Sequence, residues 1–161
     1  MENRNLFHSY FESPVGLLEI VGDENFVTEL NFREEKSSQE NPSPITRECV
    51  KQLQDFFSGK KKSFSLPLKP IGTSFQLEVW NELQKIPFSK TISYLELARR
   101  LRDEKKIRAA GNANGRNPIA IIIPCHRVIG SDGSLVGYGG GLWRKKWLIE
   151  FESGKKQAEM F

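Results

Sequence analysis

Long apolar stretches and cysteines are both scarce in this chain of 161 residues. No stretch reaches the roughly 20 apolar residues that a membrane helix needs, and the polar N-terminus lacks the apolar core of a signal peptide. The two cysteines, Cys49 and Cys125, lie far apart, which excludes a secreted scaffold held by disulfides. We therefore expect a cytoplasmic protein, or a nuclear one in a eukaryote, whose thiols can stay reduced and reactive.

Metal-ligating side chains are also few. A structural zinc site needs about four ligands, whereas the cysteines and the two histidines, His8 and His126, are scattered over the chain. We therefore expect neither a metal nor a cofactor. Cys49 lies on the apolar stripe of a helix and is expected to be buried and inert.

Positive charge is concentrated in the second half of the chain. Residues 1–73 hold nine basic and eleven acidic side chains, whereas residues 74–161 hold fifteen basic and nine acidic ones. A basic half is the natural candidate for binding a polyanion such as nucleic acid. A solvated basic surface without any partner is the alternative.

The first half alternates β-rich segments with turn residues, which predicts an antiparallel meander. The segments are Phe7–Phe11, Leu17–Val21 and Phe26–Phe32. An amphipathic helix around Leu53 follows, and prolines then mark a domain boundary near residues 66–73. We predict an α+β protein, with a structural N-terminal domain over 1–70, a mainly helical domain over 71–155 and a tail over 156–161.

Two helix starts in the second half fit the capping box, in which a hydroxyl and a carboxamide or carboxylate satisfy free amides. They are Thr73 with Gln76 and Ser93 with Glu96. A helix behind Ser93, a break at residues 102–103 and a helix over 104–114 form a helix-turn-helix candidate. That pattern is weak evidence by itself, because many helical proteins without DNA partners contain it.

The second helix of this candidate has an unusual composition. Arg108 stands near its start, and only small side chains follow. These are Ala109, Ala110, Gly111, Asn112 and Ala113. Such a face lets a helix approach a narrow groove closely, although tight packing on a neighbouring helix explains it equally well.

A reactive thiol is suggested at the end of the apolar run 119–123. Cys125 follows Pro124 and precedes His126, so the thiol is expected at the edge of the core, both shielded and accessible. An imidazole can promote the thiolate form, but a Cys-His pair alone is often coincidental. A small hairpin is predicted over residues 128–136, and a last helix carries Trp143, Trp147 and Glu152.

The full string Ile-Pro-Cys-His-Arg-Val-Ile-Gly, from Ile123 to Gly130, resembles the O6-alkylguanine-DNA alkyltransferases, also called methylated-DNA–protein-cysteine methyltransferases. The resemblance covers nearly all of residues 70–155 and includes Asn117-Pro118, Arg108-Ala109 and the glycines 139–141. The β-rich first half resembles the family's N-terminal domain, which has an RNase H-like fold.

The resemblance implies a role for each matching residue. Cys125 would accept the alkyl group once and irreversibly. His126 would act as its base through a water, with Glu152 orienting the imidazole. Asn117 would tie the helix-turn-helix to the acceptor loop.

The substrate would be O6-alkylguanine, and O4-methylthymine as well. Tyr94 would donate a hydrogen bond near N3 of the guanine. The backbone carbonyls of Cys125 and Val128 would accept from its exocyclic amine, and the Gly139 amide would bond to O6.

The resemblance also implies how DNA is bound. A monomer would place the helix of residues 108–113 in the minor groove of a duplex, and Arg108 would fill the space of the flipped base. The alkyl carbon is inaccessible within the base stack, so the nucleotide must be extruded. No membrane partner is expected.

Two departures and two competing functions remain. This chain lacks the zinc ligands of some relatives, and Ala120 stands where some members have a pocket-lining proline, so bulky benzyl adducts should react less well than methyl. Alkyltransferase-like proteins, which bind lesions without repairing them, replace the cysteine that this chain keeps. A Cys-His hydrolase is disfavoured because only His8 remains as a second histidine.

Overall fold

The computed structural model describes residues 5–36 and 39–156 of the chain, so most of the predicted tail over 156–161 lies outside it. The described residues form two compact units, one up to Ile71 and the other from Gly72 onward. Among these residues no helix combines the length and the hydrophobicity needed to span a membrane.

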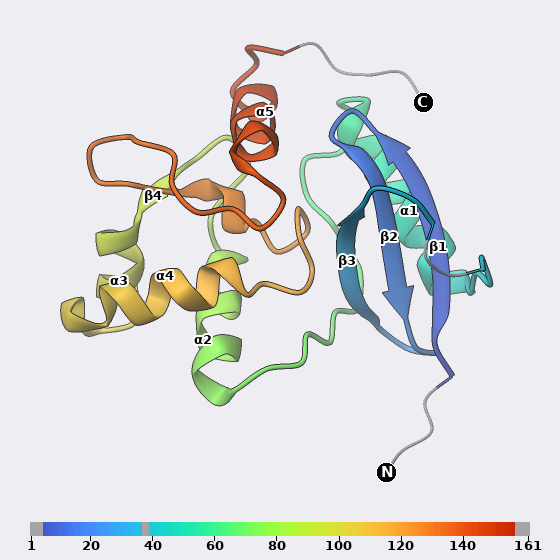
Figure 1. The fold of residues 1–161 in the computed structure, drawn as a ribbon, viewed down its shortest axis with the longest axis horizontal. Helices are drawn as coiled ribbons and strands as arrows, with labels where there is room; N and C mark the ends of the chain where they lie inside the picture. Colours follow the sequence, from blue (N-terminus) through green and yellow to red (C-terminus); the bar gives the residue numbers. More distant parts are fainter. Residues whose placement is uncertain (1–4, 37–38, 157–161) are drawn as a thin grey trace. The chain divides into compact units, whose positions relative to one another are not determined.

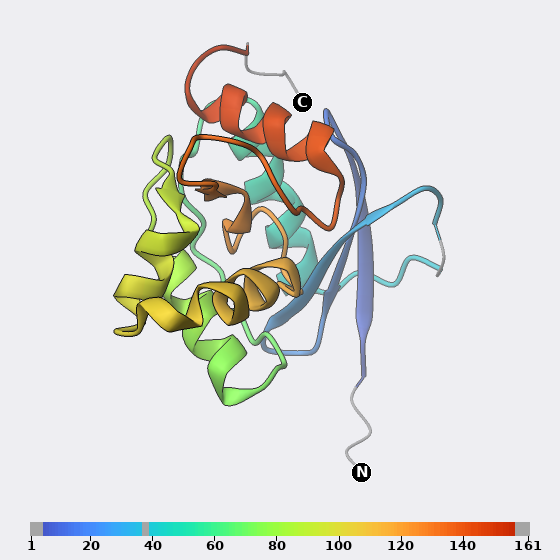
Figure 2. The ribbon, with the colours of Figure 1, turned by 60° about the vertical axis from the view of Figure 1, so that its left-hand side comes forward.

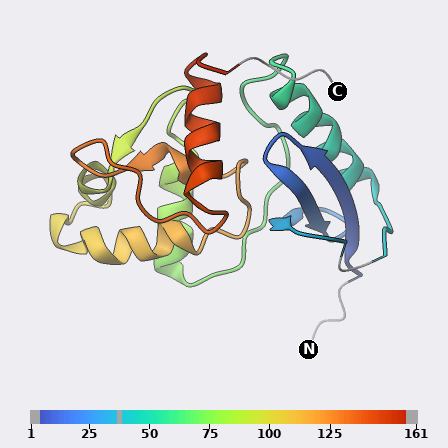
Figure 3. The same ribbon diagram turned by 45° about the horizontal axis from the view of Figure 1, so that its top comes forward.

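The first unit is an antiparallel sheet with a helix on one face (Figure 1). Its elements are β1 (Phe7–Ser13), β2 (Gly16–Gly22), β3 (Val27–Arg33) and α1 (Pro44–Phe57). The strands follow the order β1-β2-β3, so the predicted meander is confirmed. Figure 3 shows α1 running along the sheet, and the helix side chains Leu53 and Phe56 are buried with Leu18, Ile20 and Leu30 of the strands.

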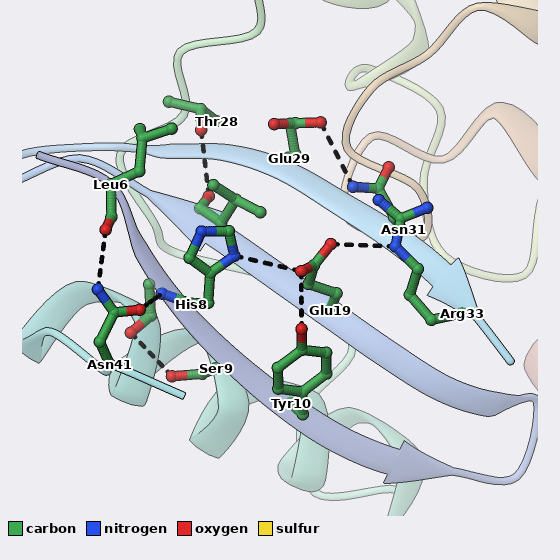
Figure 4. A network of polar contacts seen from close by, with 12 residues as sticks. Leu6, His8, Ser9, Tyr10, Glu19, Thr28, Glu29, Asn31, Arg33 and Asn41 are labelled. Carbon is green, nitrogen blue, oxygen red and sulfur yellow. Dashed lines mark hydrogen bonds and ion pairs between the residues drawn. The ribbon is translucent and has the colours of Figure 1, made fainter. Parts of the chain in front are cut away.

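A charged network occupies the other face of this sheet (Figure 4). Glu19 is almost fully buried and accepts hydrogen bonds from Tyr10 Oη at 2.9 Å and Arg33 Nε at 3.1 Å, while His8 Nδ1 lies 3.2 Å away. Burial opposes ionisation of Glu19, but these three partners outweigh it and lower the pKa. His8 is therefore engaged within the first unit.

The second unit is mainly helical (Figure 2). Its helices are α2 (Ser74–Leu83), α3 (Tyr94–Arg100), α4 (Ile107–Gly115) and α5 (Leu142–Glu152), with short 3-10 turns η1 (Glu104–Lys106) and η2 (Cys125–Arg127). Trp80 on α2 is buried and donates from Nε1 to the Ala113 carbonyl at 2.8 Å, which ties α2 to α4.

One predicted capping box forms completely and the other only by half. Thr73 Oγ1 accepts from the Gln76 amide and Gln76 Oε1 accepts from the Thr73 amide. Ser93 Oγ likewise accepts from the Glu96 amide, but the Glu96 carboxylate instead accepts from Arg100 Nε at 3.3 Å. The salt bridge one turn further along α3 thus competes with the reciprocal cap.

The break between α3 and α4 is a sharp turn with a left-handed residue. Arg102 has φ +67°, the Arg102 amide donates to the Arg99 carbonyl, and the Asp103 amide donates to the Ala98 carbonyl. This pair of bonds is the Schellman motif, which ends a helix and normally favours glycine at the left-handed position. The predicted helix-turn-helix is therefore present, and its second helix begins as the 3-10 turn η1.

The predicted hairpin over residues 128–136 is wrong. The segment Val128–Ile129 is β5, which pairs in parallel with β4 (Ile92–Ser93) rather than with residues 135–136. The glycine-rich turn does form, because the Gly130 amide donates to the Ser134 carbonyl at 2.8 Å. Residues 135–136 follow this turn without forming a strand.

Candidate active site

The acceptor candidate follows a buried and irregular segment of backbone. Residues 119–123 are all buried, as predicted, but they form turns rather than a strand. The Ile122 amide donates to the Ala120 carbonyl at 2.8 Å around Ile121, whose φ is +71°. A left-handed β-branched residue is strained, and such strain persists only where its surroundings hold it in place.

A second tight turn presents the thiol. Pro124 has φ −82° and ψ 63°, and the Cys125 amide donates to the Ile123 carbonyl at 2.8 Å, which is an inverse γ-turn. Cys125 begins η2 and is 6% exposed, so the predicted shielding of this residue is confirmed.

Two asparagines at the end of α4 hold this segment. Asn117 Nδ2 donates to the Ile123 carbonyl at 2.7 Å, and its Oδ1 accepts from the Ile119 amide at 3.0 Å. Asn114 Nδ2 donates to the Cys125 carbonyl at 3.3 Å, and that same carbonyl accepts from the Val128 amide. The end of the helix-turn-helix is therefore hydrogen-bonded to the backbone on both sides of the thiol.

The surroundings of Cys125 favour the protonated thiol over the thiolate. Burial raises the pKa of Cys125, and a hydrogen bond from Asn117, the charge of Lys145 and the Cys125 backbone amide oppose that rise. The net pKa stays above its ordinary value, so a nearby base is needed to produce the nucleophilic thiolate. Burial also raises the pKa of Cys49, to about 12, and there the charge of Glu48 adds to the rise instead of opposing it.

His126 and Glu152 form a buried pair next to the acceptor. The His126 ring is fully buried, and Nε2 lies 2.7 Å from Glu152 Oε2. Because an ionised carboxylate only accepts, Nε2 carries a proton and donates it to Glu152. His126 Nδ1 is buried and has no hydrogen-bond partner among the described residues.

Arg127 completes this cluster. Its Nε donates to Glu152 Oε1 at 2.8 Å and its Nη2 donates to Oε2 at 3.0 Å, which is a bidentate fork. Burial opposes ionisation of Glu152, but His126 and Arg127 outweigh it and hold the pKa of Glu152 at about 2. The carboxylate is therefore charged at any physiological pH.

A second polar group lies near the thiol. Lys145 on α5 is fully buried, and its Nζ donates to the Val136 carbonyl at 2.8 Å and lies 3.4 Å from Tyr94 Oη. Tyr94 Oη also donates to the Val136 carbonyl at 2.9 Å. Burial lowers the pKa of Lys145 to about 8, and the charge of Cys125 opposes that fall. Lys145, with three N–H bonds, can thus offer a hydrogen-bond donor beside the sulfur, whereas Tyr94 can do so only by releasing the Val136 carbonyl.

The predicted DNA-contacting residues divide into two sets. Arg108, Ala109 and Asn112 are exposed on α4, and Gly111 is partly exposed next to the Tyr94 ring. Ala110 and Ala113 are buried and pack inside the unit. The small side chains of α4 therefore serve tight packing on one side and leave an open helix face on the other.

The remaining predicted contacts are backbone groups. Val128 is fully buried in the β4–β5 ladder. Gly139 lies close to the end of α4, because a Cβ added there would be 3.9 Å from the Gly115 carbonyl oxygen. Ala120 is 9% exposed. None of the described residues groups three metal-ligating side chains into a possible metal site.

Three residues of the site had no role assigned from sequence. Asn114, Arg127 and Lys145 were visible only as parts of motifs or helices, since the partners cited for them lie between 9 and 41 residues away in the chain. A buried charge is rare without a pairing role. One feature of the sequence could have indicated a role for Arg127: it directly follows the Cys-His pair and stands close to the buried segment 119–123.

The comparisons with known proteins match most of the chain. Residues 6–70 match the family model "6-O-methylguanine DNA methyltransferase, ribonuclease-like domain", and residues 74–154 match the DNA binding domain of the same family. A methylated-DNA–protein-cysteine methyltransferase of Methanosarcina acetivorans is 44% identical over 91% of this chain and 98% of its own. The Haemophilus influenzae protein of that name is 40% identical over 91% and 86%.

Solved structures agree. The Mycobacterium tuberculosis protein OGT, crystallised in complex with DNA, superposes with a TM-score of 0.86 at 40% identity, covering 94% of this chain and 95% of that one. Fold and site together define an α+β alkyltransferase with an N-terminal ribonuclease-like domain, which confirms the predicted fold class. This chain belongs to the 6-O-methylguanine DNA methyltransferase family, whose members are methylated-DNA–protein-cysteine methyltransferases.

Proposed function

We propose that this protein repairs alkylated DNA by moving the alkyl group from O6 of guanine onto its own Cys125. The observation that carries the proposal is the buried contact of 2.7 Å between His126 and Glu152 directly beside a shielded cysteine. This arrangement joins a carboxylate that orients, an imidazole that accepts a proton and a thiol that attacks.

The transfer proceeds in one displacement. The Cys125 thiol proton passes through a bridging water to His126 Nδ1, and the thiolate attacks the alkyl carbon in line. The sulfur–carbon bond forms as the carbon–O6 bond breaks, and the bonding electron pair stays on O6. The guanine anion takes one proton at N1, so the thiol proton ends on the base and no co-reactant is consumed. The thioether is stable, so each molecule acts once.

Polar groups around the thiol stabilise the departing base. The Tyr94 hydroxyl turns from the Val136 carbonyl to donate a hydrogen bond to the base at N3, and Lys145 places a positive charge next to that hydroxyl. The carbonyls of Cys125 and Val128 accept from the exocyclic amine, and the Gly139 amide donates to O6. A donor aimed at developing negative charge lowers the barrier most in a site shielded from water.

The second unit binds duplex DNA in this proposal, and the first unit has a structural role. The exposed face of α4 enters the minor groove, which is about 6 Å wide and suits small side chains. Arg108 fills the gap left by the extruded nucleotide. Ala109 and Asn112 border the groove, Gly111 lets the backbone approach, and the buried Ala110 and Ala113 hold α4 in place. The protein works as a monomer, with no metal or cofactor.

Intact-mass spectrometry after incubation with an O6-methylguanine oligonucleotide tests the transfer. The expected result is a gain of one methylene on Cys125 that saturates at one per molecule. Cys125→Ala should bind the duplex but gain no mass, whereas Cys49→Ala, the matched control, should react like the natural chain.

The same experiment separates the competing functions. Binding without any mass change would leave a lesion-binding module, and repeated turnover would indicate a thiol hydrolase. Methylation of the Cys125→Ala variant would refute the acceptor assignment.

A further inference from the structure

Arg127 is a buried cation two residues after the acceptor. Its side chain is 8% exposed, and it makes contacts with two separate segments. Nη1 donates to the Ile86 carbonyl at 2.7 Å, the guanidinium lies 5.9 Å from the Phe88 ring centre, and the fork described above holds Glu152. A buried charge persists only when it is paired and hydrogen-bonded, as here.

One carboxylate therefore serves two neighbours. Glu152 Oε2 accepts from both His126 Nε2 and Arg127 Nη2, while Oε1 accepts from Arg127 Nε and lies 3.4 Å from the Ser89 amide. Burial raises the pKa of Tyr138 well above its ordinary value, and the negative charge of Glu152 contributes to this rise. The charged side chains that lower the pKa of Glu152 are His126 and Arg127.

The charges in this cluster balance only when the imidazole is neutral. Arg127 carries one positive charge and Glu152 one negative charge. If Arg127 were absent, the uncompensated carboxylate beside Nε2 would draw a second proton onto the ring, because opposite charges attract strongly in a poorly polarisable interior. A doubly protonated ring has no lone pair on Nδ1 and cannot take the thiol proton.

We propose that Arg127 is a positioning residue that balances the charge of Glu152 and thereby keeps His126 neutral in the resting protein. The proton of Cys125 can then pass to His126 inside the site, without exchange with solvent. This inference rests on the proposed alkyl transfer for its consequence, but the protonation state of His126 can be measured without any transfer.

Nitrogen-15 spectra of the resting protein at pH 7 test the charge state directly. The chain has only two histidines, so His8→Gln assigns the signals. The natural chain and Arg127→Lys, which keeps the positive charge, should each show one protonated and one unprotonated ring nitrogen on His126. Arg127→Met should show both nitrogens protonated. The double variant Arg127→Met/Glu152→Gln, which removes both charges, should show a neutral ring again.

The pH dependence of single-turnover methyl transfer gives the functional readout. Between pH 6.5 and 8.5, roughly the range over which an imidazole base works, the rate of the natural chain should stay nearly constant, because the proton moves internally. In Arg127→Met the thiol proton must leave to solvent, so the rate should rise about tenfold per pH unit. A purely structural role would lower the rate by the same factor at every pH.

Several outcomes would overturn the inference. A doubly protonated His126 in the natural chain contradicts it even if Arg127→Met fails to fold. A neutral ring in folded Arg127→Met, or a rate profile parallel to that of the natural chain, also contradicts it. If the natural chain shows the expected ring signals but transfers no methyl group, the proposed function fails while the charge-balancing role stands.

Discussion

The chemistry of the site depends on how single side chains are buried. Cys49 and Cys125 are both shielded, yet the Asn117 amide and the charge of Lys145 lower the pKa of Cys125, whereas the charge of Glu48 raises that of Cys49 further. Burial alone makes a thiol inert, because it penalises the thiolate. What distinguishes the acceptor is therefore its set of polar neighbours and not its exposure.

Ala120 is the residue at which the preference for an alkyl group can be tested. It offers one methyl group where a proline ring would add about two further methylenes, each worth about 0.8 kcal/mol when buried. Ala120→Pro should therefore raise the rate of inactivation by O6-benzylguanine by about tenfold, with little change for methylated DNA. The measurement is loss of methyl-accepting activity over time with each substrate.

Equal inactivation rates of the natural chain with methylated DNA and free O6-benzylguanine would contradict this expectation. The comparison requires that the Ala120→Pro variant is folded, and circular dichroism checks this before the rates are compared.

At the scale of elements, α3 and α4 are held in place by their ends. The turn between them requires a left-handed residue, and the C-terminal end of α4 is bonded to the acceptor loop through Asn114 and Asn117. The helix that would meet DNA is therefore mechanically connected to the nucleophile. Strain at Arg102 and at Ile121 lies on either side of this connection.

The left-handed conformation of Arg102 should lower the free energy of unfolding. A left-handed conformation costs a non-glycine residue roughly 1 kcal/mol, partly offset by the greater freedom of glycine in the unfolded chain. Arg102→Gly should therefore be more stable than Arg102→Ala by about 0.5–1 kcal/mol. Urea unfolding of both variants measures the difference. Both variants lack the Arg102 charge, so the loss of that charge cancels in the comparison. An Ala variant as stable as the Gly variant would mean that the turn relaxes.

Arg108 belongs to the same element and should act on base extrusion. Replacing the stacking lost on extrusion is worth a few kcal/mol, so Arg108→Ala should slow single-turnover repair of duplex DNA on the order of 10- to 100-fold. Reaction with the free base should be unchanged, because no duplex is opened. Arg116→Ala, an exposed arginine at the other end of α4, is the control. Equal duplex rates for the natural chain and Arg108→Ala would remove the proposed role.

At the scale of the whole molecule, the buried cluster couples folding to pH. The pKa of Glu152 falls from 4.5 to about 2 on folding, so the carboxylate stabilises the folded state above pH 4.5 and loses this contribution as the pH falls toward 2. Between pH 7 and pH 3 the free energy of unfolding should drop by about 2 kcal/mol from this group.

Urea unfolding at the two pH values measures the drop, and carbon-13 spectra of the Glu152 carboxyl group locate its titration. Glu96→Gln removes an exposed carboxylate and is the matched control, since it should not alter the pH dependence. A Glu152 carboxyl group that titrates near pH 4.5 in the folded protein would contradict the prediction.

Local patterns were sufficient to predict most of the elements. Turn residues separated the strands of the meander, Thr73 and Ser93 started helices, and the string around Cys125 indicated the acceptor. These features depend on residues close together in the chain, such as a hydroxyl and the amide three positions later. The same locality explains the error at residues 128–136, where alternation and a turn imitate a hairpin.

Only the tertiary structure decided which distant groups meet. Val128 pairs with Ile92 instead of its neighbours, Arg127 reaches Glu152 and the Ile86 carbonyl, and Lys145 reaches Val136. The sequence by itself determined the elements, the thiol and its adjacent histidine. It could not determine the charge balance around them, because the energy of a buried charge depends on partners that folding brings from other helices.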